Sequence, residues 1–499
     1  MFTKNAFYKF IHALLGLSLS IGYATVLYVH PDSVLNSIQT ALDSCALNDT
    51  ILVGPGIYYE CCVWPSTQGI NLMSELGPDT TIIDANNVGT VISISSSVTS
   101  STVITGFTIC NGDGVTGGGI DLQGAYPTIR NNIITENTAT HGGGLSSMGS
   151  SAATIVNNII TYNEAENTGG GILIYSQAST IDSNTIANNV AQWGAGIFCQ
   201  YYAGSVITNN MFSENAASAT GGGIDCYFSS PSIEGNILTT NVANYGGGIN
   251  CWTSDPTIQY NLIHGNIASG RGGGISCMDF SSPTIHGDTI TLNSGTGAGI
   301  YCESGSTPFI DSCTIADNGG AFGIYITDGA DPTIHYNNII NNRYDAIHNG
   351  NPSLTIDAEN NWWGDATGPY HPDSNPSGQG DTVSDFIDFS PWLTHPVGIE
   401  EETSSKNLVR TLQTYPNPFS KLTTITCSRE HSAESIELRI FDVSGRCVKS
   451  FQPLPDTPRS MQIRWNGTDD ARRKLPSGVY FLELTTGSSS ITKKVLLVR

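Results

Sequence analysis

Apolar and polar residues follow one another along most of the chain in a unit that repeats every 24 to 27 residues. One marker of the unit is a glycine triplet, with alanine twice in its middle position. The triplets are residues 117–119, 142–144, 169–171, 194–196, 221–223, 246–248, 272–274 and 297–299. A second marker is the isoleucine of segments similar to "PTI": Ile129, Ile155, Ile181, Ile207, Ile233, Ile258, Ile285, Ile310 and Ile334. A fixed period of this length predicts a solenoid.

Each repeat contains three short β-type segments, for example "GGGINCW", "PTIQ" and "NLIHG" between residues 246 and 265. Glycine, asparagine, proline and serine separate these segments and leave no room for a helix. We therefore predict an all-β fold, a parallel β-helix with three strands per coil and about ten to twelve coils. At the usual strand spacing of about 4.8 Å, this rod would be roughly 50 Å long.

Two positions in each repeat favour asparagine, three and eight residues after the marker isoleucine, although Asp288 and Cys313 replace it in the first row. Asparagine tolerates the left-handed backbone of a sharp corner, and stacked amides can hydrogen-bond from coil to coil. We therefore expect structural ladders at the corners of the rod. Their members include Asn132, Asn158, Asn184, Asn210, Asn236, Asn261, Asn137, Asn163, Asn189, Asn215, Asn241 and Asn266.

A row of cysteines follows the same period, each two residues after the inward apolar residue of the glycine-triplet segment. The row is Cys199, Cys226, Cys251, Cys277 and Cys302. Strand alternation points these side chains inward, so we predict a buried stack of small apolar thiols. A metal site with thiolate ligands is an alternative, but a straight row of cysteines cannot easily surround one ion. Disulfides between neighbours are a third reading, and an odd row of five cannot pair completely within itself.

The distribution of charged residues limits which classes of molecule the rod can bind. Between Lys9 and Lys406 the only basic residues besides histidine are Arg130, Arg271 and Arg343, against 35 acidic residues. Such a surface repels nucleic acid, which needs clustered Lys and Arg, so nucleic-acid binding is excluded.

The first 24 residues have the pattern of a secretory signal peptide, with Lys4 and Lys9, a short apolar run and small residues near Ala24. An uncleaved anchor helix is the alternative. No other segment is apolar enough to span a membrane, so we expect no transmembrane segment in the mature chain.

Residues 25–397 resemble the right-handed parallel β-helix superfamily, the pectate-lyase-like fold. Besides the repeats, "SIQTALDSCALNDTILVGPGIYYE" (37–60) is similar to the first helix and strand of such domains. The segments "ENNWWGDATGPYHPDSNPSGQGD" and "DFSPWL" are similar to their terminal coil and cap. The resemblance implies the fold; the superfamily includes lyases, glycosidases, epimerases and adhesins, so it implies no single activity.

The polar segment 398–410 predicts a linker, and residues 411–499 are net basic. Strand patterns with turns at Ser444-Gly445 and Asn466-Gly467 predict a small Ig-like β-sandwich. The segments "YPNPF", "IFDVSGR", "WNGTD", "GVYFLEL" and "KKVLLVR" resemble the C-terminal sorting domain of the type IX secretion system. That resemblance implies outer-membrane secretion machinery as a partner, and a protein secreted or attached at the surface of a Gram-negative bacterium.

Outward side chains of the glycine-triplet segments are expected to form two rows along the rod. The first is Asp121, Ser146, Leu173, Phe198, Asp225, Asn250, Ser276, Tyr301 and Tyr325, and the second is Gln123, Met148, Tyr175, Gln200, Tyr227, Trp252, Met278, Glu303 and Thr327. Sugar rings stack on aromatic faces, although aromatic residues also favour half-exposed strands without any ligand. The candidate polysaccharide-binding residues are Tyr175, Asp225, Tyr227, Asn250, Trp252, Arg271 and Tyr301.

Catalysis has less support. Eliminative cleavage of a uronate uses a Lys or Arg base in the superfamily that the rod resembles, and the rod contains no lysine. Calcium could supply part of the missing charge, but no dense aspartate cluster predicts a metal site. Asp279 and Glu303 form the best carboxylate pair, at roughly 5–7 Å on adjacent coils, unless Asp279 is a turn residue. We expect a polysaccharide-binding rod without chemistry; the alternative is a polysaccharide lyase or glycoside hydrolase.

Overall fold

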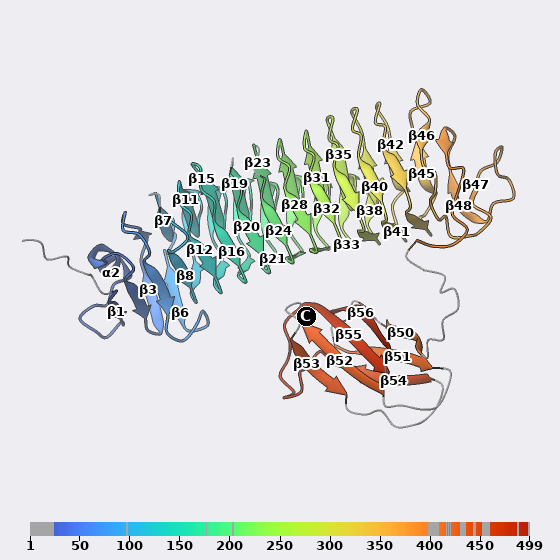
Figure 1. Ribbon diagram of the computed structural model, residues 1–499. Coiled ribbons are helices and arrows are strands. Elements are labelled where there is room, and N and C mark those ends of the chain that lie inside the picture. The colour runs from blue at the N-terminus through green and yellow to red at the C-terminus, as the bar shows by residue number, and fades with distance from the viewer. Residues whose placement is uncertain are drawn as a thin grey trace, which may run out of the picture. The chain divides into compact units, whose positions relative to one another are not determined.

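The computed structural model in Figure 1 describes residues 24–397, apart from 96–97, 176 and 202–203, and residues 409–497 with gaps. The gaps are residues 416, 418, 420, 430–435, 443–445, 452–459 and 487–488. Nearly all of the predicted signal peptide and linker therefore lies outside the described residues. The chain divides into two compact units, one up to residue 399 and one from residue 400. Each is described by itself.

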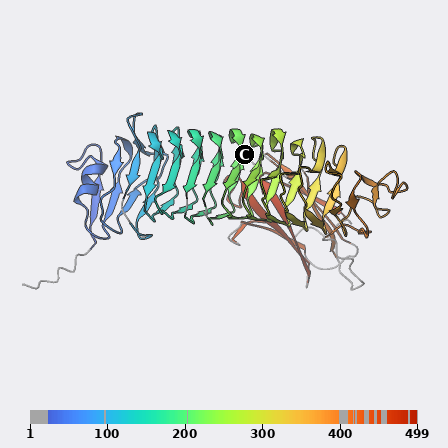
Figure 2. The same ribbon diagram turned by 90° about the horizontal axis from the view of Figure 1, so that it is seen from above.

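The first unit is a rod of parallel strands stacked coil on coil, as Figures 1 and 2 show. Sheet A has 13 strands, from β1 (Val26–Val29) to β43 (Thr333–His335), and sheet B has 12, from β3 (Gly56–Tyr59) to β44 (Asn338–Ile340). Sheet C has 14 strands. The predicted parallel β-helix is confirmed, with about 13 coils.

Sheet C contains the strands that follow the glycine triplets. Its strands in spatial order are β4 (Cys62–Val63), β7 (Ile92–Ile94), β11 (Ile120–Gln123), β15 (Leu145–Met148), β19 (Ile172–Tyr175), β23 (Ile197–Gln200), β27 (Ile224–Tyr227), β31 (Ile249–Trp252), β35 (Ile275–Met278), β39 (Ile300–Cys302), β42 (Phe322–Ile326), β45 (Asp345–Asn349), β48 (Gly380–Val383) and β47 (Pro369–Tyr370). The register pairs Cys199 with Cys226, and so on along the row to Cys302. All five thiols are free and fully buried, so the predicted inward stack is confirmed.

Eight coils contain a fourth strand that the repeat pattern did not predict. These strands form sheet D: β10 (Asp113–Thr116), β14 (Thr138–His141), β18 (Glu164–Thr168), β22 (Val190–Trp193), β26 (Ala216–Thr220), β30 (Val242–Tyr245), β34 (Ile267–Arg271) and β38 (Ser294–Thr296). Their second residue is a buried alanine in six coils, such as Ala191 and Ala243. Because each strand is short and precedes a glycine triplet, it resembles a loop in the sequence.

The asparagine ladders are confirmed. Asn189 is typical: its side-chain amide donates to Oδ1 of Asn215 at 3.0 Å and to the carbonyl of Ile160 at 3.0 Å. The reason given for asparagine at these positions is wrong, however. The left-handed residue of each corner is the one before the ladder position, such as Asn131 (φ 56°) or Asn188 (φ 55°). The ladder asparagines are selected by their hydrogen bonds rather than by backbone conformation.

Backbone conformation and close contacts between coils both favour glycine in the triplets. Gly246 has φ 62°, a conformation that costs other residues about 1–2 kcal/mol. A Cβ on Gly248 would lie 2.6 Å from the carbonyl oxygen of Gly274 in the next coil. The triplet therefore makes a tight turn from sheet D into sheet C.

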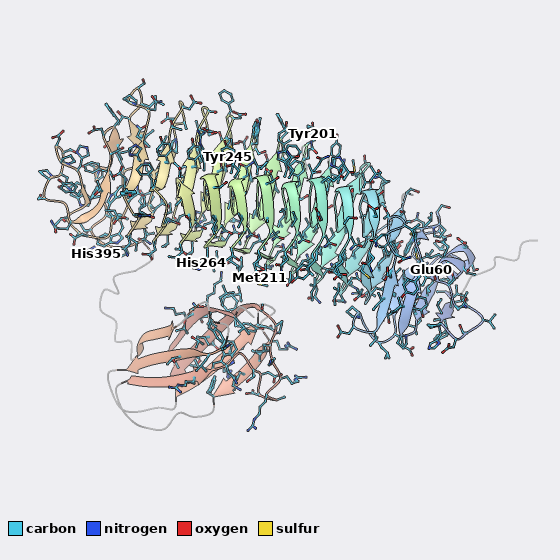
Figure 3. The ribbon with its side chains drawn as sticks, turned by 180° about the vertical axis from the view of Figure 1, so that it is seen from behind. Glu60, Tyr201, Met211, Tyr245, His264 and His395 are labelled. Carbon is cyan, nitrogen blue, oxygen red and sulfur yellow. The ribbon has the colours of Figure 1, made fainter. Side chains whose placement is uncertain are left out.

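Both ends of the rod are closed. At the N-terminal end, helix α2 (Ile38–Ser44) is capped by Ser37 and buries Ile38 and Leu42. The carboxylate of Glu60, labelled in Figure 3, accepts hydrogen bonds from the backbone N–H groups of Ile38 and Gln39 at 2.9 and 2.8 Å. At the other end, the predicted terminal coil buries Trp363 completely.

The second unit consists of two antiparallel sheets. One contains β50 (Val409–Tyr415), β51 (Thr423–Arg429) and β54 (Ser460–Trp465); the other contains β53 (Cys447–Phe451), β52 (Ile436–Asp442), β55 (Gly478–Thr486) and β56 (Ser489–Leu497). Side chains of both sheets share one core, in which Trp465 packs edge-on against Tyr480 with ring centroids 5.5 Å apart.

Candidate functional site

The outer side of sheet C carries the two rows of side chains that the sequence suggested as a binding surface. The expected exposure of the first row is wrong for all of its members except Asp121 and Tyr325. Asp225, Asn250 and Tyr301 are each only 1% exposed, so these three candidates cannot contact a polysaccharide in this conformation. The second row remains accessible, because its three candidates are only half-buried: Tyr175, Tyr227 and Trp252.

The turn made by the glycine triplet covers the first row. A Cβ on Gly221 would lie 2.4 Å from the Cβ of Asp225, because the turn folds back against the strand that it introduces. The last residue of β26 adds to the cover of Asp225, because the hydroxyl of Thr220 donates a short hydrogen bond to its carboxylate. Alternation places this row outward from the core, but the fourth sheet and its turn bury it.

Burial gives Asp225 unusual chemistry for a surface strand. The amide of Asn250 donates to the Asp225 carboxylate at 2.8 Å, yet desolvation still raises the pKa of Asp225 to about 6. Oδ1 of Asn250 and the hydroxyl of Ser276 are buried, and each lacks a hydrogen-bond partner among the described residues. This polar row is covered and does not face solvent.

An aromatic cluster lies on the outer side of sheet C over four successive coils. We define it as Tyr175, Phe198, Tyr201, Tyr227, Phe228 and Trp252. Ring centroids lie 5.3 Å apart for Tyr175 and Tyr201, 6.1 Å for Tyr201 and Tyr227, and 6.2 Å for Tyr227 and Trp252. Figure 3 shows Tyr201 at one edge of the rod, opposite Met211 and His264 of sheet B. The rings thus form a continuous platform along the rod.

Arg271, the one cation that the sequence placed beside this surface, lies beyond the cluster and is already paired. Its guanidinium forms an ion pair with Glu303 and lies 5.1 Å from the ring centroid of Tyr301 and 6.0 Å from that of Tyr245. The hydroxyl of Tyr301 donates to Glu303 at 2.9 Å, and burial, together with this hydrogen bond, raises the pKa of Tyr301. Arg271 and Glu303 therefore form a neutral unit.

A second aromatic group follows the ion pair toward the C-terminal end of the rod. The ring of Tyr325 stacks on that of Tyr301 at 5.5 Å and on that of Phe322 at 5.2 Å. His348 lies 4.2 Å from Phe322 between ring centroids. Aromatic rings therefore line sheet C on both sides of Arg271.

Asp279 and Glu303 lie on adjacent coils with an offset of one residue, as the sequence suggested. The register that pairs Cys277 with Cys302 places Glu303 beside Met278, one position before Asp279. Asp279 has φ 47° and is the turn residue that follows the strand, which is the alternative that the sequence suggested. Since Glu303 is also neutralised by Arg271, it is not a free carboxylate.

Sequence reasoning missed Tyr201 and Phe228, which follow the strand ends at Gln200 and Tyr227. Both have left-handed φ values, 53° and 49°, so strand alternation does not predict where their rings point. The signal available in the sequence was the adjacency of aromatic residues, "YF" at residues 227–228 and "QYY" at residues 200–202.

Among the described residues, no three His, Cys, Asp or Glu side chains are arranged to hold a metal ion. Calcium binding stays a prediction. None of the helices in the described segments is long and apolar enough to cross a membrane.

The fold and repeats define a right-handed parallel β-helix, and comparison with protein families agrees. The model of the family described as "Right handed beta helix region" matches residues 91–263 and 241–362, more than half of the chain, so the protein belongs to this family. Residues 413–498 match the "Secretion system C-terminal sorting domain". The protein therefore carries a type IX sorting signal, which links it to that secretion machinery. It is a secreted or cell-surface protein of a Bacteroidetes-type Gram-negative bacterium.

No curated protein matches the sequence. Among solved structures, PorZ of Porphyromonas gingivalis, a surface component of the type IX secretion system, is 18% identical over 18% of this chain and 11% of its own, with a TM-score of 0.14. A mannuronic acid specific family 6 polysaccharide lyase from human gut microbiota is 12% identical over 68% of this chain and 87% of its own (TM-score 0.35). Tailspike protein 4 of bacteriophage CBA120 is 11% identical over 90% and 64% (TM-score 0.21). Likenesses this distant do not bear on what the chain does.

Proposed function

We propose that this exported β-helix protein binds polysaccharide on the outer side of sheet C, with the aromatic cluster as the binding surface. The observation that carries the proposal is the platform of half-exposed rings on four successive coils, spaced 5.3 to 6.2 Å from one another. Sugar rings present apolar C–H faces that pack on aromatic rings, and a row of rings suits a chain of sugars.

The arrangement of the rings supports binding by a rigid surface. Tyr227 contacts four other members of the cluster, including Phe198 stacked beneath it at 6.2 Å and Phe228 edge-on at 4.7 Å. Rings held by their neighbours lose little conformational freedom when a ligand arrives, which favours affinity. The sheet beneath is fixed by the hydrogen bonds of adjacent coils.

We propose binding without cleavage. Hydrolysis of a glycoside requires two carboxyl groups on either side of the bond, one of them able to donate a proton. On this surface Glu303 is engaged by Arg271 and Tyr301, and Asp225 is covered by the glycine turn. Neither carboxyl group supports the alternative of a glycoside hydrolase.

The test is a screen of the full chain against a glycan array, followed by titration of each hit in solution. Trp252→Ala and Tyr227→Ala should each weaken binding about tenfold or more, as expected for central aromatic contacts. Tyr162→Ala is the matched control, because Tyr162 is an exposed aromatic residue outside sheet C. If no glycan binds, or if the control variant loses as much affinity as the other two, the proposal fails. New reducing ends in the incubated glycan would instead indicate an enzyme.

A further inference from the structure

The aromatic cluster lies in a part of the rod that has no basic side chain. Residues 131–270 contain no Lys or Arg, and residues 172–253, the coils of the cluster, contain four acidic residues. One of the four, Asp225, is buried, and the others are Asp182, Glu214 and Glu234. A carboxylate or sulfate on a bound sugar would find no cation here and would be repelled by the charge of the rod.

The nearest candidate for an anion partner is Arg271, and its charge is already compensated. Glu303 is 8% exposed and also accepts the hydroxyl hydrogen bond of Tyr301, so the ion pair is fixed on both sides. The Arg271 side chain is 43% exposed, so a ligand carboxylate could approach it, but it would share the guanidinium with Glu303, whose negative charge repels a second carboxylate. The pair therefore attracts an acidic sugar less strongly than an uncompensated arginine would.

We propose, resting on the proposed binding function, that the ligand of the aromatic cluster is an uncharged polysaccharide. Uncharged sugars have no ionic group to desolvate at a surface without cations, and their C–H faces pack on Tyr201, Tyr227 and Trp252. The rings lie on consecutive coils, so the sugar chain runs along the rod rather than across it. In this account Arg271 and Glu303 act together as a neutral boundary that excludes acidic sugars.

The experiment measures binding of the full chain to two sets of polymers under identical conditions, once with calcium and once with a chelator. The uncharged set contains a β-glucan, a xylan without uronic acid and a galactomannan; the acidic set contains polygalacturonate and polymannuronate. At least one uncharged polymer should bind about tenfold more tightly than either acidic polymer. A preference for an acidic polymer, with or without calcium, would overturn the inference.

A variant that should gain affinity for acidic polymers tests the role of the ion pair. Glu303→Gln leaves the Arg271 charge uncompensated, so it should increase the affinity for polygalacturonate or polymannuronate about threefold or more. Glu164→Gln is the matched control, since it removes one exposed carboxylate on sheet D, away from Arg271, and should change nothing. Unchanged acidic-polymer binding in a folded Glu303→Gln protein would contradict the role given to the ion pair. If that variant does not fold, the preference of the wild-type protein for uncharged or acidic polymers is the test of the inference.

The outcomes separate the two proposals. If the protein prefers acidic polymers and Trp252→Ala abolishes their binding, the inference is overturned, but polysaccharide binding by the aromatic cluster still holds. Absence of binding to every polymer of both sets would overturn the proposed function itself.

Discussion

Asp288 replaces an asparagine within a ladder, and its replacement by asparagine should stabilise the rod in a pH-dependent way. Its Oδ1 accepts hydrogen bonds from the backbone N–H and the side-chain amide of Asn261, at 2.6 and 2.9 Å, as a ladder asparagine would. Its Oδ2 takes the position of the missing amide, is buried, and has no hydrogen-bond partner within the described part of the chain. At that position Asn261 donates to the carbonyl of Ile233 at 2.9 Å. A carboxylate can only accept, so the ladder at Asp288 is satisfied best when this side chain is protonated.

The magnitude follows from the pKa. Burial raises the pKa of Asp288 from 3.8 to about 7, although the hydrogen bonds from Asn261 act in the opposite direction. Because the folded protein holds this proton more tightly than the unfolded chain, the stabilisation is fully present below pH 3.8 and is lost as the pH rises through 7. The difference corresponds to about 4 kcal/mol of unfolding free energy. Asparagine at this position carries no charge at any pH and should avoid the loss.

The assay is denaturant-induced unfolding of the wild type and Asp288→Asn at pH 5 and pH 8. We expect the variant to exceed the wild type by about 2–4 kcal/mol at pH 8 and by much less at pH 5. Asp279→Asn is the control, because it makes the same charge change in a partly exposed turn one strand away. If the wild type and Asp288→Asn respond equally to pH, the protonated ladder position is wrong.

Three further predictions concern the ladder, the thiols and the tail. Asn215→Ala should lower the unfolding free energy, measured with denaturant, by roughly 3 kcal/mol or more. The substitution removes the acceptor of two N–H groups of Asn189 and the donor to the carbonyl of Ile186. A decrease below about 1 kcal/mol would contradict the ladder account. The five stacked cysteines are fully buried, so peptide mapping should find them unlabelled by a thiol reagent in the folded protein and all labelled after unfolding; a pair that needs reduction first would indicate a disulfide. Deletion of residues 411–499 should leave the rod inside the cell envelope when fractions of a type IX host are compared, and normal export of the truncated chain would refute the sorting role.

Much of the rod could be predicted from the sequence because its main determinants recur in every coil. Inward Ile258 or Cys251 and the ladder residue Asn266 each have an equivalent one period away, so a local pattern becomes a stacked row. Strand alternation then orients each side chain relative to the core. This logic depends only on period and register, and both are visible in the sequence.

The binding surface was only partly predictable because it depends on contacts that the period does not encode. Alternation pointed Asp225 outward, but it could not show that a glycine turn and a sheet D strand would cover it. The ion pair of Arg271 and Glu303 joins residues 32 positions apart that have different places in the repeat. Tyr201 lies in a turn with positive φ, where alternation no longer gives the direction of the ring.

The most direct test of the central claim is a structure of the full chain bound to the tightest oligosaccharide from the uncharged set. We predict sugar rings packed on Tyr227 and Trp252, with the oligosaccharide running along successive coils of sheet C. An oligosaccharide seated elsewhere on the rod, for instance beside Met211 and His264 on sheet B, with the aromatic cluster uncovered, would contradict the account.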